Sequence, residues 1–300
     1  MLHILTHDIL PVFSMLALGF VLGRMGTLSR DEAAAVNRVA FLVLQPALIF
    51  PLIAAVDFRA FALDGLAVYA ACQVVAFAAS FLLARFVFGR EKIEAWLLAM
   101  AVVFVNSLLY IWPISVLLYG SQNNMPITAV VAWDASVSFA FFIISTDLMA
   151  NRGGGTAKAV RRVATNPVLI GILAGVIVNL GGLHVPEPVL TAAKFAGAGA
   201  APLTLLALGV ILSGQRIAPG PVVLGISGMK LLVFPALVWA GLSLIEAPGN
   251  WEPLLQLNAA GPSGAMAFAL AMLYRVRTDA IAPVIIWTSL LSLFSLAALA

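Results

Sequence analysis

The chain has 300 residues, of which 63% are hydrophobic and only 10% are charged, and its formal net charge is +3. Soluble domains carry about 25% charged residues. This composition, with a mean hydropathy of +1.08, therefore excludes a soluble or peripheral protein and predicts an integral membrane protein. The modest charge, without a basic cluster interleaved with aromatic residues, gives no sign of nucleic-acid binding. The single cysteine, Cys72, cannot form an intrachain disulfide. No pair of histidines has metal-ligand spacing, so neither a metal nor another cofactor is expected.

Ten apolar segments of roughly membrane-spanning length follow one another along the chain. The runs are continuous rather than alternating, which predicts transmembrane α-helices and not a β-barrel. No basic region precedes the first run, so we expect a retained span and not a cleaved signal peptide. The expected spans are residues 8–24, 33–53, 63–86, 95–119, 125–149, 165–182, 190–213, 220–245, 252–274 and 279–299.

The longest connection, at 151–162, separates five spans from five spans. We expect residues 1–150 to form a first five-helix repeat, 151–164 a cytoplasmic linker and 165–300 a second repeat. The loops after odd-numbered spans contain twelve Lys and Arg residues, and those after even-numbered spans contain two. Basic residues in short loops mark the cytoplasmic side, which predicts a multi-pass protein of the cell (inner) membrane with both termini outside. The twelve are Arg24, Arg30, Arg85, Arg90, Lys92, Arg152, Lys158, Arg161, Arg162, Arg216, Arg275 and Arg277, and the two are Arg59 and Lys194.

Short motifs recur between the two halves at nearly constant offsets of 156, 152 and 154 residues. The matched pairs are Gln45–Leu48 with Ala201–Thr204, Asn106 with Asn258, and Trp133 with Trp287. Five spans per half is an odd number, so the second repeat must enter the membrane from the opposite side and the repeats are expected to be inverted. Inverted repeats place a substrate near the bilayer midplane and allow alternating access. The sequence thus predicts an all-α membrane protein of ten helices in two inverted repeats.

Two of the expected spans contain residues that break helices. Gly261, Pro262 and Gly264 lie in the middle of the ninth span. Asn106 and Pro113 mark a similar interruption in the fourth. Proline removes a backbone donor and clashes with the preceding turn, and glycine raises the conformational cost of a helix. A break in lipid leaves backbone groups unpaired, so it persists only where it faces protein or a water-filled cavity. Two interrupted helices at corresponding places indicate the substrate site of a transporter.

The residues that carry a family resemblance run through nearly the whole chain. They are Pro11–Phe20, Asn37 and Gln45–Phe50 in the first half, and Asn166–Gly175, Pro186, Ala201–Gly209, Lys230–Pro235 and Pro262–Gly264 in the second. Together these motifs resemble the auxin efflux carrier family, whose bacterial members include malonate-type transporters. The resemblance implies a ten-helix fold of the kind found in sodium/proton antiporters and bile-acid transporters. It also implies crossed broken helices 4 and 9 and the transport of small organic anions. One departure is the bulky run Ser107–Trp112, where the family has a glycine-rich turn, so the resemblance does not fix the shape of the pocket.

The candidate substrate-binding residues at the two breaks are Asn106, Pro113, Asn258, Pro262 and Ser263. Asn106 stands about twelve residues into its span, which is roughly 18 Å along a helix and near the middle of an apolar core about 30 Å thick. Its amide could hold an unpaired backbone group or a substrate carboxylate, or could make an interhelical hydrogen bond. Past each break a half-helix begins, and its unpaired amides and positive dipole end suit an anion. Ser263 could cap the second half-helix or contact substrate.

Three further polar residues, Lys230, Asp134 and Gln73, lie deep in expected spans. A lysine there must face a cavity or a partner: Lys230 could attract an anionic substrate, replace a bound cation, or form an ion pair that ties the repeats together. Asp134 is a candidate for proton coupling, since a buried carboxyl group can take up a proton near neutral pH; alternatively it pairs with Lys230 or contacts the crossover. Gln73 stands 157 residues before Lys230 and is the expected neutral counterpart in the first repeat. Asp147 is expected at a solvated helix end.

These observations favour a secondary transporter that moves a small carboxylate by alternating access, with its site at the crossing of helices 4 and 9. The sequence has no G-x-x-x-x-G-K-[ST] motif, which excludes ATP-driven transport within this chain. An intramembrane enzyme is disfavoured because no nucleophile–base pair stands at membrane depth. A channel or a membrane sensor for small anions is the alternative. The expected partners are the lipid bilayer and a small organic anion, while proton or sodium coupling and a homodimer stay open.

Overall fold

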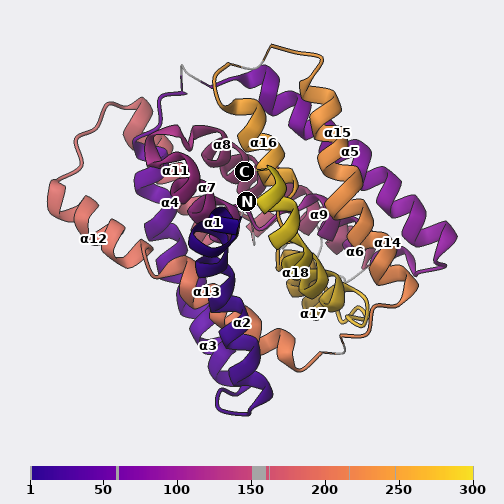
Figure 1. The fold of residues 1–300 in the computed structure, drawn as a ribbon. Coiled ribbons are helices and arrows are strands. Elements are labelled where there is room, and N and C mark those ends of the chain that lie inside the picture. Colours follow the sequence, from indigo (N-terminus) through magenta and orange to yellow (C-terminus); the bar gives the residue numbers. More distant parts are fainter. Residues whose placement is uncertain are drawn as a thin grey trace.

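The computed structural model describes residues 2–58, 61–150, 160–161, 163–215, 217–246 and 248–299 (Figure 1). Within these residues the secondary structure is helical, and the only β-type pairing is one antiparallel bridge. The labels α denote α-helices; the labels η denote π-helical turns, except η6, which is a 3-10 turn. The first half contains α1 (Leu2–Ile4), η1 (Leu5–Ile9), α2 (Leu10–Arg24), α3 (Arg30–Val39), η2 (Ala40–Leu44), α4 (Gln45–Ala54), α5 (Leu63–Leu82), η4 (Leu83–Val87), α6 (Lys92–Val103), η5 (Ser107–Ile111), α7 (Trp112–Tyr119), η6 (Ser121–Asn123), α8 (Met125–Trp133), η7 (Asp134–Ser138) and α9 (Phe139–Met149). The second half contains α11 (Pro167–Leu180), α12 (Glu187–Gly197), α13 (Ala200–Ser213), α14 (Pro221–Gly228), η8 (Met229–Val233), α15 (Phe234–Leu242), α16 (Trp251–Ala259), α17 (Met266–Tyr274) and α18 (Ile281–Leu299).

Seven helical segments in the described part of the chain are long and apolar enough to cross a membrane, by length and composition. This agrees with the predicted all-α membrane protein. Three of the ten expected spans are not among these seven segments. The sixth is α11, whose 14 residues cover about 21 Å. The fourth and ninth are interrupted. The seven are Leu5–Arg24, Arg30–Ala54, Leu63–Val87, Met125–Met149, Glu187–Ser213, Pro221–Leu242 and Ile281–Leu299.

Local sequence explains where several helices begin. The Ser29 hydroxyl accepts a hydrogen bond from the backbone amide of Glu32, and the Glu32 carboxylate accepts one from the backbone amide of Ser29, so a reciprocal capping box starts α3. The side chain of Asn166 accepts hydrogen bonds from the amides of Val168 and Leu169, and Pro167 occupies the first turn of α11. Both starts use groups that satisfy helix amides which would otherwise lack a partner.

Helices of the two halves are interleaved. On one side of the molecule α13 packs along α2 and α3, while α11 and α12 pack on α4 (Figure 1). On the other side α5 lies against α6 and α15, and α14 lies against α18. The broken elements α6, α16 and α17 belong to this second group through their contacts with α5, α15 and α18. The N-terminal turn η1 also contacts α18, so the two ends of the chain lie beside each other.

The helices α2 and α13 pack with their backbones in contact. A Cβ atom at Gly19 would collide with the backbone of Leu206, and one at Gly209 would collide with the backbone of Leu16. Small residues let membrane helices approach closely enough for backbone contact. This contact therefore fixes one helix of the first half directly on one of the second.

Some of the basic residues that predict the orientation lie outside the described residues. The 151–159 stretch of the linker lies outside the described residues. The basic residues outside them are Arg59, Arg152, Lys158, Arg162 and Arg216.

Candidate functional site

The two helix breaks meet and pair with each other. Between α6 and η5, and between α16 and α17, the chain leaves helical geometry for a few residues. Val105 and Ser263 form an antiparallel bridge there. The amide of Asn106 donates to the carbonyl of Pro262 at 3.0 Å, and the amide of Gly264 donates to the carbonyl of Phe104 at 2.8 Å. Backbone groups freed from one broken helix are thus satisfied by the other, as an apolar surrounding requires.

The two asparagines of these segments have different surroundings. Asn258 is the last residue but one of α16 and is fully buried; its amide Nδ2 donates to the hydroxyl of Tyr69 at 2.7 Å. Its Oδ1 has no hydrogen-bond partner among the described residues. Asn106 lies inside the other break and is half-buried. Its carbonyl accepts from the amides of Tyr110 and Ile111, both at 3.1 Å, and its side chain has no hydrogen bond within the described chain.

The C-terminal end of each first half-helix receives a hydrogen bond from a polar side chain. Gln73 Nε2 donates to the carbonyl of Val103, the last residue of α6, at 3.2 Å. Lys230 Nζ donates to the carbonyl of Ala259, the last residue of α16, at 2.6 Å. Terminal helix carbonyls lack an intrahelical partner and carry partial negative charge. Gln73 and Lys230, which the sequence offset matched, thus donate hydrogen bonds to corresponding helix ends, those of α6 and α16.

Lys230 is fully buried and has no ion pair with a carboxylate in the part of the chain that the structure describes. Besides the carbonyl of Ala259, its ammonium group faces the ring of Phe234, 5.0 Å from the ring centroid. Both contacts are attractive for a cation. The ammonium is therefore directed to the end of α16.

Asp134 belongs to the same polar network through Gln73. Its Oδ1 accepts from Gln73 Nε2 at 2.9 Å and from Ser138 Oγ at 3.0 Å. Gln73 Oε1 in turn accepts from the indole of Trp133 at 2.8 Å. Asp134 Oδ2 is buried and lacks a partner among the described residues. Asp134 therefore contacts the crossover through Gln73. It forms no direct ion pair with Lys230 in the described structure.

Ser263 is not the cap of the half-helix that follows it. The helix α17 begins at Met266, so its N-cap residue is Ala265, and no side chain caps the helix there. The capping interpretation is therefore wrong, because α17 begins two residues too late for it. Ser263 instead donates its amide to Thr288 Oγ1 at 3.2 Å, and its own Oγ is buried without a partner in the described structure. Pro113 lies in the first turn of α7, beyond the paired stretch.

Several residues that surround the two paired breaks were not singled out from the sequence. Tyr69 is the partner of Asn258 and stands four residues before Gln73, on the same face of α5. That spacing could have indicated it. Ser107 and Ser138 lie in the π-helical turns η5 and η7, as Lys230 lies in η8. A π-turn changes which face a side chain occupies and is common at functional sites, but no sequence rule predicts one.

A second polar cluster lies at the end of α6 away from the break. Glu94 is almost fully buried and accepts from Arg90 at 2.9 Å and from Arg277 at 2.8 Å. The nearby Glu94 carboxylate raises the pKa of the Arg277 guanidinium. Close by in sequence, Tyr274 donates its hydroxyl to Asp147 at 2.8 Å. Asp147 is buried, so the expectation of a solvated position for it is wrong.

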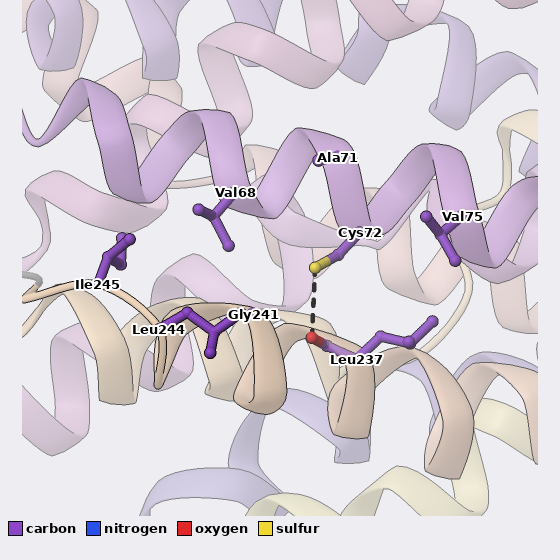
Figure 2. Close-up of a pocket in the computed structure, with 8 residues that line it drawn as sticks. All are labelled: Val68, Ala71, Cys72, Val75, Leu237, Gly241, Leu244 and Ile245. Carbon is purple, nitrogen blue, oxygen red and sulfur yellow. Dashed lines mark hydrogen bonds between the residues drawn. The ribbon is translucent and has the colours of Figure 1, made fainter.

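Two hollows of the described structure contain none of the predicted site residues. One is an apolar groove of ≈ 360 Å³ between α5 and the α15 end, where Cys72 donates to the carbonyl of Leu237 at 3.3 Å (Figure 2). The other, of ≈ 370 Å³, lies between Gln215 and the 277–279 loop. The candidate site is defined by the paired breaks and their buried polar atoms.

A multi-pass helical protein with two interrupted helices paired around buried polar groups belongs to the class of membrane transport proteins. The comparison with known families agrees: a family model described as "Membrane transport protein" matches residues 4–158 and 154–300. The chain belongs to this family, the auxin efflux carrier family, as its motifs suggested.

Two archaeal relatives, each named as an uncharacterized transporter, are similar to the chain over nearly its full length. The relative from Methanothermobacter thermautotrophicus is 28% identical over 300 residues, which cover 97% of this chain and 96% of the relative. The relative from Methanocaldococcus jannaschii is 23% identical over 299 residues, which cover 96% of each chain. Family and relatives indicate a multi-pass membrane transporter and not an enzyme.

Proposed function

We propose that this protein is a secondary transporter that moves a small carboxylate across the membrane by alternating access. Its ten spans form two inverted five-helix repeats, and substrate binds where the two broken helices pair. A homodimer is compatible with this proposal but is not needed for it.

The pairing of the two breaks carries the proposal. Unwound backbone is costly in a membrane and persists only where protein or water satisfies it. Two unwound segments, one from each half, lie against each other through Val105 and Ser263. Interrupted helices that meet between two repeats are the architecture in which secondary transporters bind substrate.

Buried polar atoms without partners support a ligand at this pairing. The hydroxyls of Ser107 and Ser263 are buried and unpaired among the described residues. Buried polar groups in proteins are nearly always hydrogen-bonded, so such a group calls for water or a ligand. Ser107 opens the half-helix η5–α7, and Ser263 precedes α17. Each hydroxyl thus lies near helix amides whose partial positive charge favours an anion.

The charges nearby fit a carboxylate coupled to a proton. Lys230 places a buried positive charge at the end of α16, beside Asn258, which supports an anion electrostatically without being its direct ligand. Asp134 touches the first break through Gln73 and is the candidate for carrying the proton. Sodium coupling is the alternative.

Counterflow in proteoliposomes tests the proposal. Purified protein would be reconstituted with unlabelled malonate inside, and uptake of labelled malonate and of other mono- and dicarboxylates would be measured. We expect saturable uptake that is accelerated by unlabelled substrate on the opposite side, since one site serves both faces. Uptake that neither saturates nor shows counterflow would indicate a channel instead, and no uptake or binding of any carboxylate would reject the anion assignment.

A further inference from the structure

The two half-helix ends at the crossover are covered by donors of different charge. At α6 the donor is the neutral side-chain amide of Gln73, whereas at α16 it is the charged ammonium group of Lys230. A neutral donor is sufficient to satisfy a terminal carbonyl, as Gln73 demonstrates. The second break therefore needs the positive charge of Lys230 for a reason other than pairing the Ala259 carbonyl.

Three oxygens suggest what that reason is, one at the end of α16, one on the residue before it and one on the helix that carries Lys230. The carbonyl of Ala259 lies at the negative end of the helix dipole. Asn258, one residue earlier, has a buried Oδ1 without a partner in the described residues. Ser227, three residues before Lys230 on the same helix, has a buried and equally unpaired Oγ. Carbonyl, amide and hydroxyl oxygens are the ligands of small hard cations, and the C-terminal ends of broken helices coordinate such ions in transporters.

We propose that the Lys230 ammonium is a built-in cation that occupies a monovalent-cation site at the C-terminal end of α16. The protein then works without a bound sodium ion at this place. Removing the ammonium uncovers a site for Na⁺, Li⁺ or a small alkylammonium ion. The consequence that transport does not need sodium rests on the proposed transporter function. The existence of the cation site does not depend on that function.

Thermal stability of the purified full-length protein tests the site without any substrate. The melting temperature Tm would be measured in NaCl, LiCl, KCl, methylammonium chloride and choline chloride at equal ionic strength. For the wild type we expect the same Tm in sodium and in choline. Lys230→Ala should melt lower in choline, and Na⁺, Li⁺ or methylammonium should raise its Tm in a saturable way, because a ligand that binds only the folded state stabilises it. Lys194→Ala, the same change at an exposed lysine of α12, should behave as the wild type does.

Either of two results with the wild type and Lys230→Ala would overturn the proposal. One is a wild-type protein that sodium stabilises more than choline does. The other is a Lys230→Ala protein whose Tm is the same in all five salts. Should Lys230→Ala not fold in any salt, Lys230→Met fills the space without charge. It is expected to melt lower than the wild type and to respond to no cation, and an unchanged Tm would contradict the role of the ammonium.

A transport measurement separates this inference from the proposed function. Malonate counterflow by the wild type should be equal in sodium and choline, while that of Lys230→Ala should need sodium or methylammonium. Loss of counterflow that no cation restores, in a variant whose Tm those cations do raise, would show that Lys230 is a substrate ligand as well. Absence of malonate transport in the wild type would count against the proposed function and leave the Tm result standing.

Discussion

Asp134 is held in a way that suits a group that gains and loses a proton. One carboxyl oxygen accepts two hydrogen bonds, and the other is buried without a partner among the described residues. In Asp134→Asn the amide oxygen can keep the bonds from Gln73 and Ser138, so the variant should fold. We expect it to retain malonate exchange but to lose accumulation driven by a pH gradient. Uptake with and without an imposed gradient measures this.

Ser138→Ala is the control for this prediction, because it removes one hydrogen bond to Asp134 but keeps the carboxyl group. It should keep gradient-driven accumulation. If Asp134→Asn still accumulates malonate in response to a pH gradient, the coupled proton is carried by another group or by the substrate.

Asn258→Ala tests the amide at the second break. The change leaves the buried Tyr69 hydroxyl without its partner, which costs about 1–3 kcal/mol of folding free energy. We expect a folded protein with a lower Tm and strongly reduced carboxylate uptake. Tyr69→Phe breaks the same hydrogen bond from the other side but keeps Asn258, so it should lose stability and retain more uptake. Equal uptake by Asn258→Ala and the wild type would remove Asn258 from the site.

At the scale of single residues the sequence predicted which polar groups lie at the centre, but not how they are paired. Gln73 and Lys230 were matched as counterparts, and they do contact corresponding helix ends. Asn106 and Asn258 were matched as well, yet one lies inside a break and the other still in a helix. The breaks have different lengths, three residues between α6 and η5 and six between α16 and α17. A constant offset in sequence therefore does not give equivalent positions in space.

Between elements, the backbone contact of α2 with α13 is the most sensitive to side-chain size. Gly209→Leu would place a side chain where the backbone of Leu16 and Phe20 now lies. Overpacking of this kind costs typically about 1–3 kcal/mol, and more where backbones must separate. We expect a clear fall in Tm, measured in detergent with the purified protein. Gly220→Ala, at a glycine with no atom near its missing Cβ, should melt like the wild type. An unchanged Tm in Gly209→Leu would mean that the two helices are not in close contact.

The Glu94–Arg277 pair ties the first broken helix, at the start of α6, to the loop after the second, beyond α17. A structure that alternates between two openings must loosen such ties on one side. We expect Arg277→Ala to lower Tm and to shift the protein toward the conformation open at this end. Reaction of Gln215→Cys, in the neighbouring hollow, with a membrane-impermeant thiol reagent would report the shift in a Cys72→Ala background. Lys92→Ala, an exposed basic residue at the same helix end, is the control. Equal reaction rates in both variants would contradict a gating role.

Proline and glycine content predicted the second helix break, because their effect on a helix is local. It did not predict the position of the first, since Phe104–Asn106 contains neither residue and the expected break at Asn106–Pro113 is wrong: Ser107–Pro113 is helical. It did not predict the π-helical turns that hold Asp134 and Lys230, since such turns are imposed by packing. Nor did it predict that α11 ends after 14 residues. The apolar run is longer than the helix because Gly181 and Gly182 allow the chain to turn, with Gly182 at a φ of +57°.

For the whole molecule, the sequence separated two halves, whereas the structure interleaves them. Contacts such as α13 with α2 and α11 with α4 join helices far apart in the chain. Hydrophobicity and charge say which segments enter the membrane, but not which neighbours they choose, since lipid and protein offer similar apolar surroundings. The arrangement therefore had to come from the structure.

The predicted topology depends on whether α11 crosses the membrane. Its 14 residues cover about 21 Å, less than the apolar core of about 30 Å. Its exposed side chains Ile170, Leu173, Ile177 and Leu180 are all apolar, as lipid contact requires, and a short span can be accommodated by local thinning of the bilayer. We therefore expect α11 to cross and the second half to be inverted relative to the first.

Single cysteines in a Cys72→Ala background can decide this. In the first half, Met25→Cys should face the cytoplasm and Gln122→Cys the outside, in agreement with the basic loop residues beside Met25. If α11 crosses, Ala218→Cys is cytoplasmic and Pro248→Cys is outside. If α11 enters and leaves on the same side, those two positions exchange sides, while the first pair stays as it is. Labelling of intact cells and of inverted vesicles with an impermeant reagent distinguishes the two cases. The exchanged pattern would overturn the inverted repeat and, with it, the case for alternating access about the paired breaks.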